Sequence, residues 1–220
     1  MSGQMDEKLI ENSLILAQLD TILRAGTSVL LSKNFIENFG KVNSKDVADL
    51  KNLITIIPKN LFRAKKLCVL NPSFKEAELV HGADCDLILD DTIIEIKTIK
   101  KLEFRSESFY QLLGYYILNE IGGITILGKI EINKLGIYYS RFGYFFQFNI
   151  QDVIDLNKIS EVKKWFVDYA KKLLKKFRIF PSYFYRILQI FPTLTLSIPT
   201  TYPPNYYIRR PQDLRAYRGY

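Results

Sequence analysis

The chain has 220 residues, of which 48% are hydrophobic and 25% are charged, the composition of an ordinary globular protein. No apolar run reaches the roughly 18 residues of a membrane-spanning helix, and two cysteines, Cys68 and Cys85, are too few for a disulfide framework. The polar N-terminus lacks the pattern of a signal peptide, so we expect a cytoplasmic protein with no membrane attachment. The formal net charge of +8 suggests an anionic partner, of which nucleic acid is the commonest, although lysine-rich surfaces also occur without one.

Two helices are predicted in the first part of the chain. Residues 6–24 carry apolar side chains at near-helical spacing, and a second helix is expected from Ser44 to Ile56. Ser44 or Asp46 can cap this second helix, and the proline that follows stops it.

Residues 82–97 predict a tight β-hairpin. Two short apolar runs flank Asp90-Asp91, a turn dipeptide because Asp tolerates the left-handed conformation and bonds its own backbone. A two-residue turn fixes the register and places opposite residues on one face of the sheet. From the turn outward, this register pairs Leu89 with Thr92, Ile88 with Ile93, Asp86 with Glu95, and Asp84 with Lys97.

A helix is expected over residues 106–121. Ser106 or Ser108 can cap it, and two glycines follow its end. Gln111 and Tyr115 are four residues apart and therefore share a face of this helix.

Three further segments follow in chain order. Residues 136–140 and 144–148 predict a tyrosine-rich hairpin with a three-residue connection that ends in Gly143. This hairpin is either a well-packed edge of the sheet or a place where Tyr138, Tyr139 or Arg141 contacts a nucleic-acid backbone. Residues 158–178 predict a basic helix, either a solvated face or a surface that contacts phosphates. The lysines that define this surface are Lys163, Lys164, Lys171, Lys172, Lys175 and Lys176. Residues 181–220 are rich in Pro, Tyr and Arg and are expected to be poorly ordered.

The predicted hairpin gathers carboxylates and an ammonium group on one surface. Asp86 and Glu95 repel each other when they lie close together, so they favour a bound cation. Oxygen ligands of this kind suit Mg²⁺ or Mn²⁺. Lys97, two residues beyond Glu95 on the same face, can polarise a water molecule or neutralise charge that develops on a phosphate.

The order Asp86, then Glu95-Ile96-Lys97, resembles the core motif of the PD-(D/E)XK nuclease superfamily, and Gln111-Leu-Leu-Gly-Tyr115 is similar to the Gln-x-x-x-Tyr helix of its RecB-like branch. The resemblance covers about residues 70–150. It implies a restriction-endonuclease-like α/β core, with a mixed sheet of about four or five strands flanked by helices. It also implies a Mg-dependent deoxyribonuclease in which Asp86, Glu95 and the Ile96 carbonyl hold the metal, Lys97 activates water, and Gln111 and Tyr115 support the site. Some relatives carry an iron–sulfur cluster, for which this chain has too few cysteines.

Some assignments stay open from the sequence. Asp84 competes with Asp86 as the principal ligand; the register favours Asp86, and a slipped turn would favour neither, because a one-residue shift exchanges the faces. His81 is the only histidine and is either structural or a metal ligand, and Glu78 is among several candidates for an additional acid. The expected division is a helical part over 1–68, a nuclease core over 69–180 and the tail over 181–220. The main rival function is a catalytically silent nucleic-acid-binding module on the same fold.

Overall fold

The computed structural model describes residues 6–25, 30 and 32–176. The chain divides into two compact units, Met1–Pro58 and Lys59–Tyr220, so the second unit begins before the boundary expected at residue 68. The tail predicted over 181–220 lies outside the described residues.

The first unit is helical, as predicted. Its elements are α1 (Glu7–Ala25), α2 (Lys33–Asn38) and α3 (Ser44–Thr55), and α1 contacts α3. The side-chain amide of Gln18 joins α1 to the loop before α3, because it donates to the Lys41 carbonyl at 2.9 Å and accepts from the Gly40 N–H at 2.9 Å.

The cap predicted for α3 was wrong by one residue. Asn43, in neither of the expected positions, has the extended backbone of an N-cap and accepts a hydrogen bond from the Lys45 N–H. Asn is as good an N-cap as Ser or Asp, so Ser44 becomes the first helical residue.

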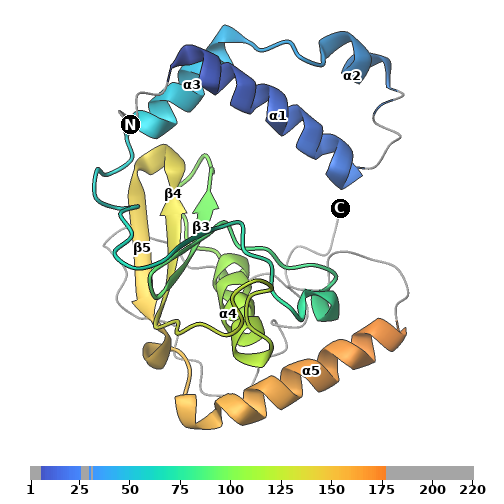
Figure 1. The fold of residues 1–220 in the computed structure, drawn as a ribbon, viewed down its shortest axis with the longest axis vertical. Helices are drawn as coiled ribbons and strands as arrows, with labels where there is room; N and C mark the ends of the chain where they lie inside the picture. The colour runs from blue at the N-terminus through green and yellow to red at the C-terminus, as the bar shows by residue number, and fades with distance from the viewer. Residues whose placement is uncertain (1–5, 26–29, 31, 177–220) are drawn as a thin grey trace. The chain divides into compact units, whose positions relative to one another are not determined.

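The second unit is built on a five-stranded mixed sheet flanked by helices, which confirms the predicted α/β class (Figure 1). The strands lie in chain order across the sheet, and only the β3–β4 pair is parallel. Helix α4 (Ser106–Ile121) connects this parallel pair and lies across it. The strands are β1 (Cys68–Leu70), β2 (Leu87–Leu89), β3 (Thr92–Lys97), β4 (Lys134–Tyr139) and β5 (Tyr144–Asn149).

The β2–β3 hairpin has the predicted register next to its turn. Leu89 pairs with Thr92 and Ile88 with Ile93, and Asp90 has a positive φ of 54°. The Asp90 carboxylate also accepts hydrogen bonds from three consecutive backbone N–H groups, those of Lys65, Lys66 and Leu67. The turn is therefore tied to the segment that leads into β1.

Replacing Asp90 with Asn is expected to destabilise the protein in a pH-dependent way. The backbone donors hold the pKa of Asp90 below its usual value, so the ionised group contributes stability that is fully present above the usual Asp pKa. That contribution disappears as the pH falls through the lowered pKa of the folded state. The difference in melting temperature between wild type and Asp90→Asn should therefore be largest at neutral pH and vanish in acid. A difference that does not change with pH would contradict this account.

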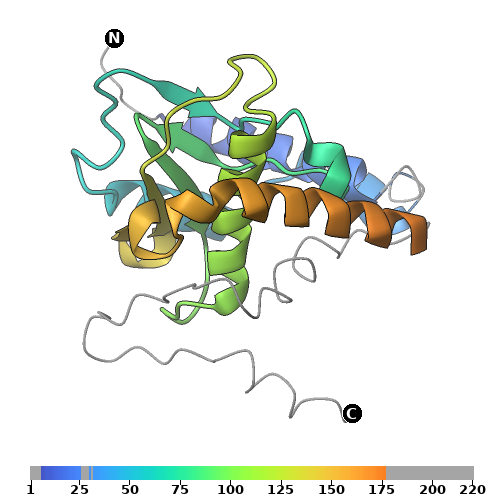
Figure 2. The ribbon, with the colours of Figure 1, turned by 90° about the horizontal axis from the view of Figure 1, so that it is seen from below.

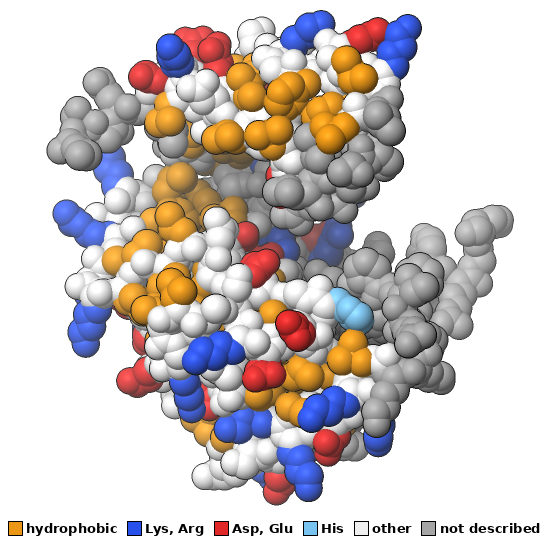
Figure 3. All heavy atoms as spheres, turned by 45° about the vertical axis from the view of Figure 1, so that its right-hand side comes forward, with side chains coloured by type: hydrophobic (Ala, Val, Ile, Leu, Met, Phe, Trp, Pro, Cys, Tyr) orange, Lys and Arg blue, Asp and Glu red, His pale blue; other side chains and the backbone are white. Residues whose placement is uncertain are grey.

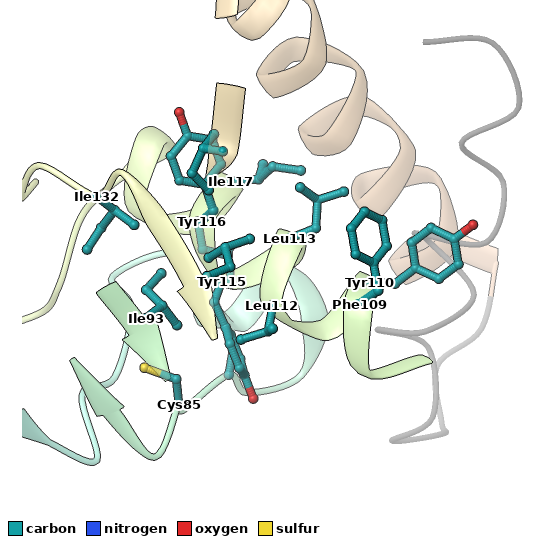
Figure 4. Packing of buried hydrophobic residues seen from close by; sticks show 14 of the residues in the cluster. Cys85, Ile93, Phe109, Tyr110, Leu112, Leu113, Tyr115, Tyr116, Ile117 and Ile132 are labelled. Atoms are coloured by element: carbon teal, nitrogen blue, oxygen red, sulfur yellow. The ribbon is translucent and has the colours of Figure 1, made fainter. Parts of the chain in front are cut away.

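The core of the second unit lies between the sheet and α4. Residues 112–118 of α4 are all buried, and Leu112 and Tyr115 pack with Ile93 and Cys85 (Figure 4). Helix α5 (Ile159–Lys176) crosses α4 and also contacts the short helix η2 (Ala77–Val80) (Figure 2). The buried side chains that α5 contributes to this core are Val162, Phe166 and Ala170.

The β4–β5 hairpin and α5 form where they were predicted. The connection between the strands is the single turn η3 (Ser140–Phe142), followed by Gly143 with a left-handed φ of 57°. Neither Ser106 nor Ser108 caps α4; Arg105 occupies the N-cap position without a side-chain hydrogen bond. None of the helices in the described part of the chain combines the length and apolar character needed to span a bilayer.

Candidate metal and phosphodiester site

Strand β3 carries the two charged residues at the centre of the candidate site. Glu95 and Lys97 are two residues apart and so project from the same face of the strand, which is the face covered by α4. Glu95 is 6% exposed, and its Oε1 lies 2.7 Å from the Lys97 Nζ. A carboxylate and an ammonium group are therefore held in contact at the end of an otherwise apolar strand.

Helix α4 supplies the next members of a hydrogen-bonded chain. The Lys97 Nζ donates to Gln111 Oε1 at 2.9 Å, and Gln111 Nε2 donates to the Tyr115 hydroxyl at 2.7 Å. The ring of Phe74 stacks on the ring of Tyr115, with centroids 5.5 Å apart. The helical spacing of four residues thus places both polar side chains over β3 and fixes the direction of Lys97.

Asp86 reaches the same strand from the neighbouring side. It lies immediately before β2, and its Oδ2 accepts a hydrogen bond from the Ile96 N–H at 2.7 Å. In a strand, the N–H and C=O of one residue point to the same side, so the Ile96 carbonyl also points toward the side of Asp86. Asp86 is also close enough to Glu95 for the two charges to interact, and this occurs where β2 has ended and no longer pairs with β3.

The electrostatics of Glu95 favour a cation. Burial raises the pKa of Glu95 above its usual value, and the nearby charge of Asp86 raises it further, while Lys97 opposes both effects. Glu95 Oε2 is buried and has no hydrogen-bond partner. A buried carboxylate oxygen without a partner is costly, and a bound metal ion would satisfy it.

Mg²⁺ or Mn²⁺ fits this set of donors. Magnesium commonly binds through one or two carboxylates and keeps several water molecules or substrate phosphates as its other ligands. Asp86, Glu95 and the Ile96 carbonyl are oxygen donors of the right kind. Within residues 6–25, 30 and 32–176, no group of three or more His, Cys, Asp or Glu side chains is placed to hold a metal ion, so water and substrate would complete the coordination.

The expected pairing of Asp84 with Lys97 was wrong. Strand β2 begins only at Leu87, and Asp84 instead pairs with Ser73, whose hydroxyl donates to Asp84 Oδ1 at 2.6 Å. The hairpin register is therefore lost beyond Leu87, because the chain turns toward the segment that follows β1. Asp84 is held by Ser73, so Asp86 is the aspartate whose charge acts on Glu95.

The other candidate ligands lie on or next to η2. Glu78 is an exposed residue within this short helix, and His81 follows it with a left-handed φ of 62°. The structure does not group either residue with Asp86 and Glu95 in a metal-binding cluster.

The lysines of α5 have different roles from one another. The Nζ of Lys163 donates to the Glu120 carbonyl at 3.3 Å, at the last turn of α4, whereas Lys164, Lys171 and Lys172 are exposed. The side chains of Lys175 and Lys176 lie outside the described residues. Lys163 therefore stabilises the end of a helix, and among the lysines with described side chains a phosphate-binding role stays open for Lys164, Lys171 and Lys172.

Sequence reasoning missed Thr98 and Ser140. Their hydroxyl oxygens are 2.7 Å apart, and Ser140 also donates to the Lys97 carbonyl at 3.4 Å. No local sequence motif predicts this contact, because it depends on the parallel pairing of β3 with β4. Tyr138 and Tyr139 are 2% and 3% exposed, which supports the packing interpretation for both and leaves Arg141 as the exposed member of that group.

Comparison of the chain with protein-family models, with curated proteins and with solved structures gives no significant match.

Proposed function

We propose that the chain is a metal-dependent nuclease of the PD-(D/E)XK type that hydrolyses phosphodiester bonds in DNA. The observation that carries the proposal is the constellation on β3: buried Glu95 with one free oxygen, Asp86 beside it, and Lys97 held by Gln111. Metal ligands and a positioned cation both assist phosphodiester hydrolysis, because each can neutralise negative charge that develops on the phosphate.

Each side chain has a role that follows from its contacts. Asp86, Glu95 and the Ile96 carbonyl would hold Mg²⁺ or Mn²⁺, which when bound supplies charge neutralisation at the scissile phosphate. Lys97 would orient the attacking water molecule and offset negative charge in the transition state. Gln111 holds the lysine nitrogen, and Tyr115 holds the amide of Gln111. The site therefore has both a polar centre and a supporting layer on a rigid helix.

The direct test is cleavage of supercoiled plasmid, linear duplex, single-stranded DNA and RNA by the full chain with Mg²⁺, with Mn²⁺ and with EDTA. Metal-dependent cleavage of a DNA substrate supports the proposal. Binding without cleavage under every condition would favour the alternative, a catalytically silent nucleic-acid-binding module. One observation favours this alternative: the described residues place no third acidic or histidine side chain beside Asp86 and Glu95.

Mg²⁺ is expected to raise the melting temperature of the protein. Binding to the folded state alone, at about ten times the Kd, adds about 1.4 kcal/mol and raises the Tm by about 3–6 °C for a protein of this size. Calorimetric titration with Mg²⁺ and thermal scans measure both quantities. Glu95→Gln should abolish the increase, because it removes the charge but keeps the shape. No heat of binding and no increase in Tm at millimolar Mg²⁺ would argue against the site.

A further inference from the structure

Two segments lie at the carboxyl end of β3, where Lys97 is the last residue of the strand. Residues 98–105 follow β3, and residues 140–142 follow β4. Because β3 and β4 are parallel, both segments leave the sheet at the carboxyl end of these strands. In open α/β sheets, ligands bind outside the carboxyl ends of the strands. We call residues 98–105 and 140–142 together the carboxyl-end rim.

Hydrogen bonds hold the two parts of the rim together and join them to the candidate site. The Thr98 and Ser140 hydroxyls are 2.7 Å apart, and Ser140 donates to the carbonyl of Lys97 itself. The hydroxyl of Tyr139, the last residue of β4, donates to the Glu103 carbonyl at 3.2 Å. The rim is therefore a fixed extension of the strand that carries Lys97.

The rim has a net positive charge. Its sequence contains Lys100, Lys101, Arg105 and Arg141 but only one acidic residue, Glu103, and Glu103 pairs with Arg105. Lys100 and Lys101 are exposed, and neither is within ion-pair distance of a carboxylate in the described part of the chain. These two ammonium groups are available to an external anion.

An aromatic ring lies on the same rim. Phe142, the last residue of η3, is 41% exposed. Unpaired bases stack on exposed aromatic rings, and this contact contributes about 1–3 kcal/mol per base. The rim therefore carries both exposed lysines and an exposed ring, the two kinds of side chain that bind single-stranded nucleic acid through its phosphates and its bases.

The basic helix α5 occupies a different place. Lys163 of α5 donates to the carbonyl of Glu120, at the end of α4. The α4 residue that contacts Lys97 is Gln111, which comes nine residues before Glu120. At 1.5 Å per residue, these two points on α4 are about 13 Å apart along its axis. The α5 sequence also includes the acidic residues Glu161 and Asp168, so this helix is not uniformly basic. Basic and acidic side chains are also interspersed on the face of the molecule that Figure 3 shows.

We infer that the carboxyl-end rim is the surface that binds the substrate strand: Lys100 and Lys101 contact phosphates of a single-stranded segment, and Phe142 stacks on one of its bases. This inference rests on the proposed function in one respect: only a nuclease would direct the bound nucleic-acid strand from the rim to Lys97. It assigns the contacts closest to the chemistry to the rim, and not to α5.

The charge part of the inference is tested by binding without cleavage. The full chain is titrated in EDTA with a fluorescein-labelled oligothymidylate at several salt concentrations. Lys100→Gln/Lys101→Gln removes two phosphate contacts and should lower the slope of log K against log salt by about 1.4. Lys164→Gln/Lys171→Gln removes the same charge from α5 and serves as the matched control, with a slope close to that of wild type. An unchanged slope in the rim variant, or an equal loss in both variants, would overturn the inference.

The stacking part is tested with Phe142→Ala and Phe142→Tyr. The alanine variant should bind the oligothymidylate about tenfold more weakly, whereas tyrosine should restore binding because it keeps the ring. A hairpin duplex without single-stranded ends should be insensitive to both changes. Loss of oligothymidylate binding in the tyrosine variant, or equal loss of duplex binding in the alanine variant, would contradict stacking on an unpaired base.

Failure of the inference and failure of the proposed function give different results. If the chain binds the oligothymidylate through the rim but never cleaves DNA with Mg²⁺ or Mn²⁺, the inference stands and the nuclease proposal fails. If it cleaves DNA and the rim variant retains both its salt slope and its activity, the nuclease proposal stands and the rim is not the binding surface.

Discussion

Lys97→Ala is expected to reduce DNA cleavage by at least about 100-fold, the scale on which loss of one preorganised charge-stabilising group affects catalysis. The lysine nitrogen contacts both the Glu95 carboxylate and the Gln111 amide, so no neighbouring side chain in the described structure replaces it. The fold should survive, because a buried Glu95 without its partner takes up a proton instead of remaining charged. Cleavage rates under single-turnover conditions, with circular dichroism to confirm folding, provide the measurement.

Asp86→Ala and Glu95→Gln should cause losses of similar size. These groups act as a unit, so Glu95→Gln combined with Lys97→Ala should be no slower than the slower single variant. Lys134→Ala is a suitable control, since this lysine lies at the opposite end of the parallel strands and makes only a 3.8 Å pair with Asp91. Full activity in Lys97→Ala would refute the mechanism.

The largest expected loss of stability comes from Gly123→Ala. Gly123 has a left-handed φ of 76°, and a Cβ at this position would overlap the backbone of Gly128 and Lys129. The clash is with main chain in a turn closed by two hydrogen bonds between Ile124 and Gly128, so no flexible side chain can move aside. Together, strain and overlap should cost on the order of 3 kcal/mol and lower the Tm by about 6–12 °C.

Gly128→Ala separates the two causes. Its φ is also left-handed, at 72°, but nothing lies within 4 Å of an added Cβ. It should cost only the left-handed penalty of about 1–2 kcal/mol. Urea unfolding of the two variants gives the comparison, and equal losses would show that the overlap at Gly123 is relieved by movement of the turn.

The sequence predicted the hairpin correctly next to its turn, where the determinants are local. The Asp90-Asp91 turn sets the register, and alternation along the strand then places Glu95 and Lys97 on one face. Likewise, helical spacing alone brings Gln111 and Tyr115 together, and the structure joins them by a hydrogen bond. Contacts set by turn type or by helical period follow from short stretches of sequence.

Contacts that depend on long-range pairing were not predicted. Strand β1 has three residues, and Leu70 at its end is 72% exposed, so no hydrophobic pattern identifies it. Ser73 captures Asp84 only because β1 brings the following segment alongside the hairpin. The link between Thr98 and Ser140 likewise requires β4 to lie parallel to β3. Tertiary arrangement, and not local propensity, determined each of these outcomes.

The position of Cys85 provides a chemical probe of how often the hairpin opens. Its thiol is 1% exposed, and burial together with the charges of Glu95 and Asp86 raises its pKa, so native Cys85 has neither the access nor the thiolate form that alkylation needs. In a Cys68→Ser background, which removes the exposed thiol, the rate of alkylation would report local opening of the segment that carries Asp86. A ligand that bridges Asp86 and Glu95 would slow that rate even where the melting temperature hardly changes, so the alkylation rate would report the fraction of the protein whose site is occupied.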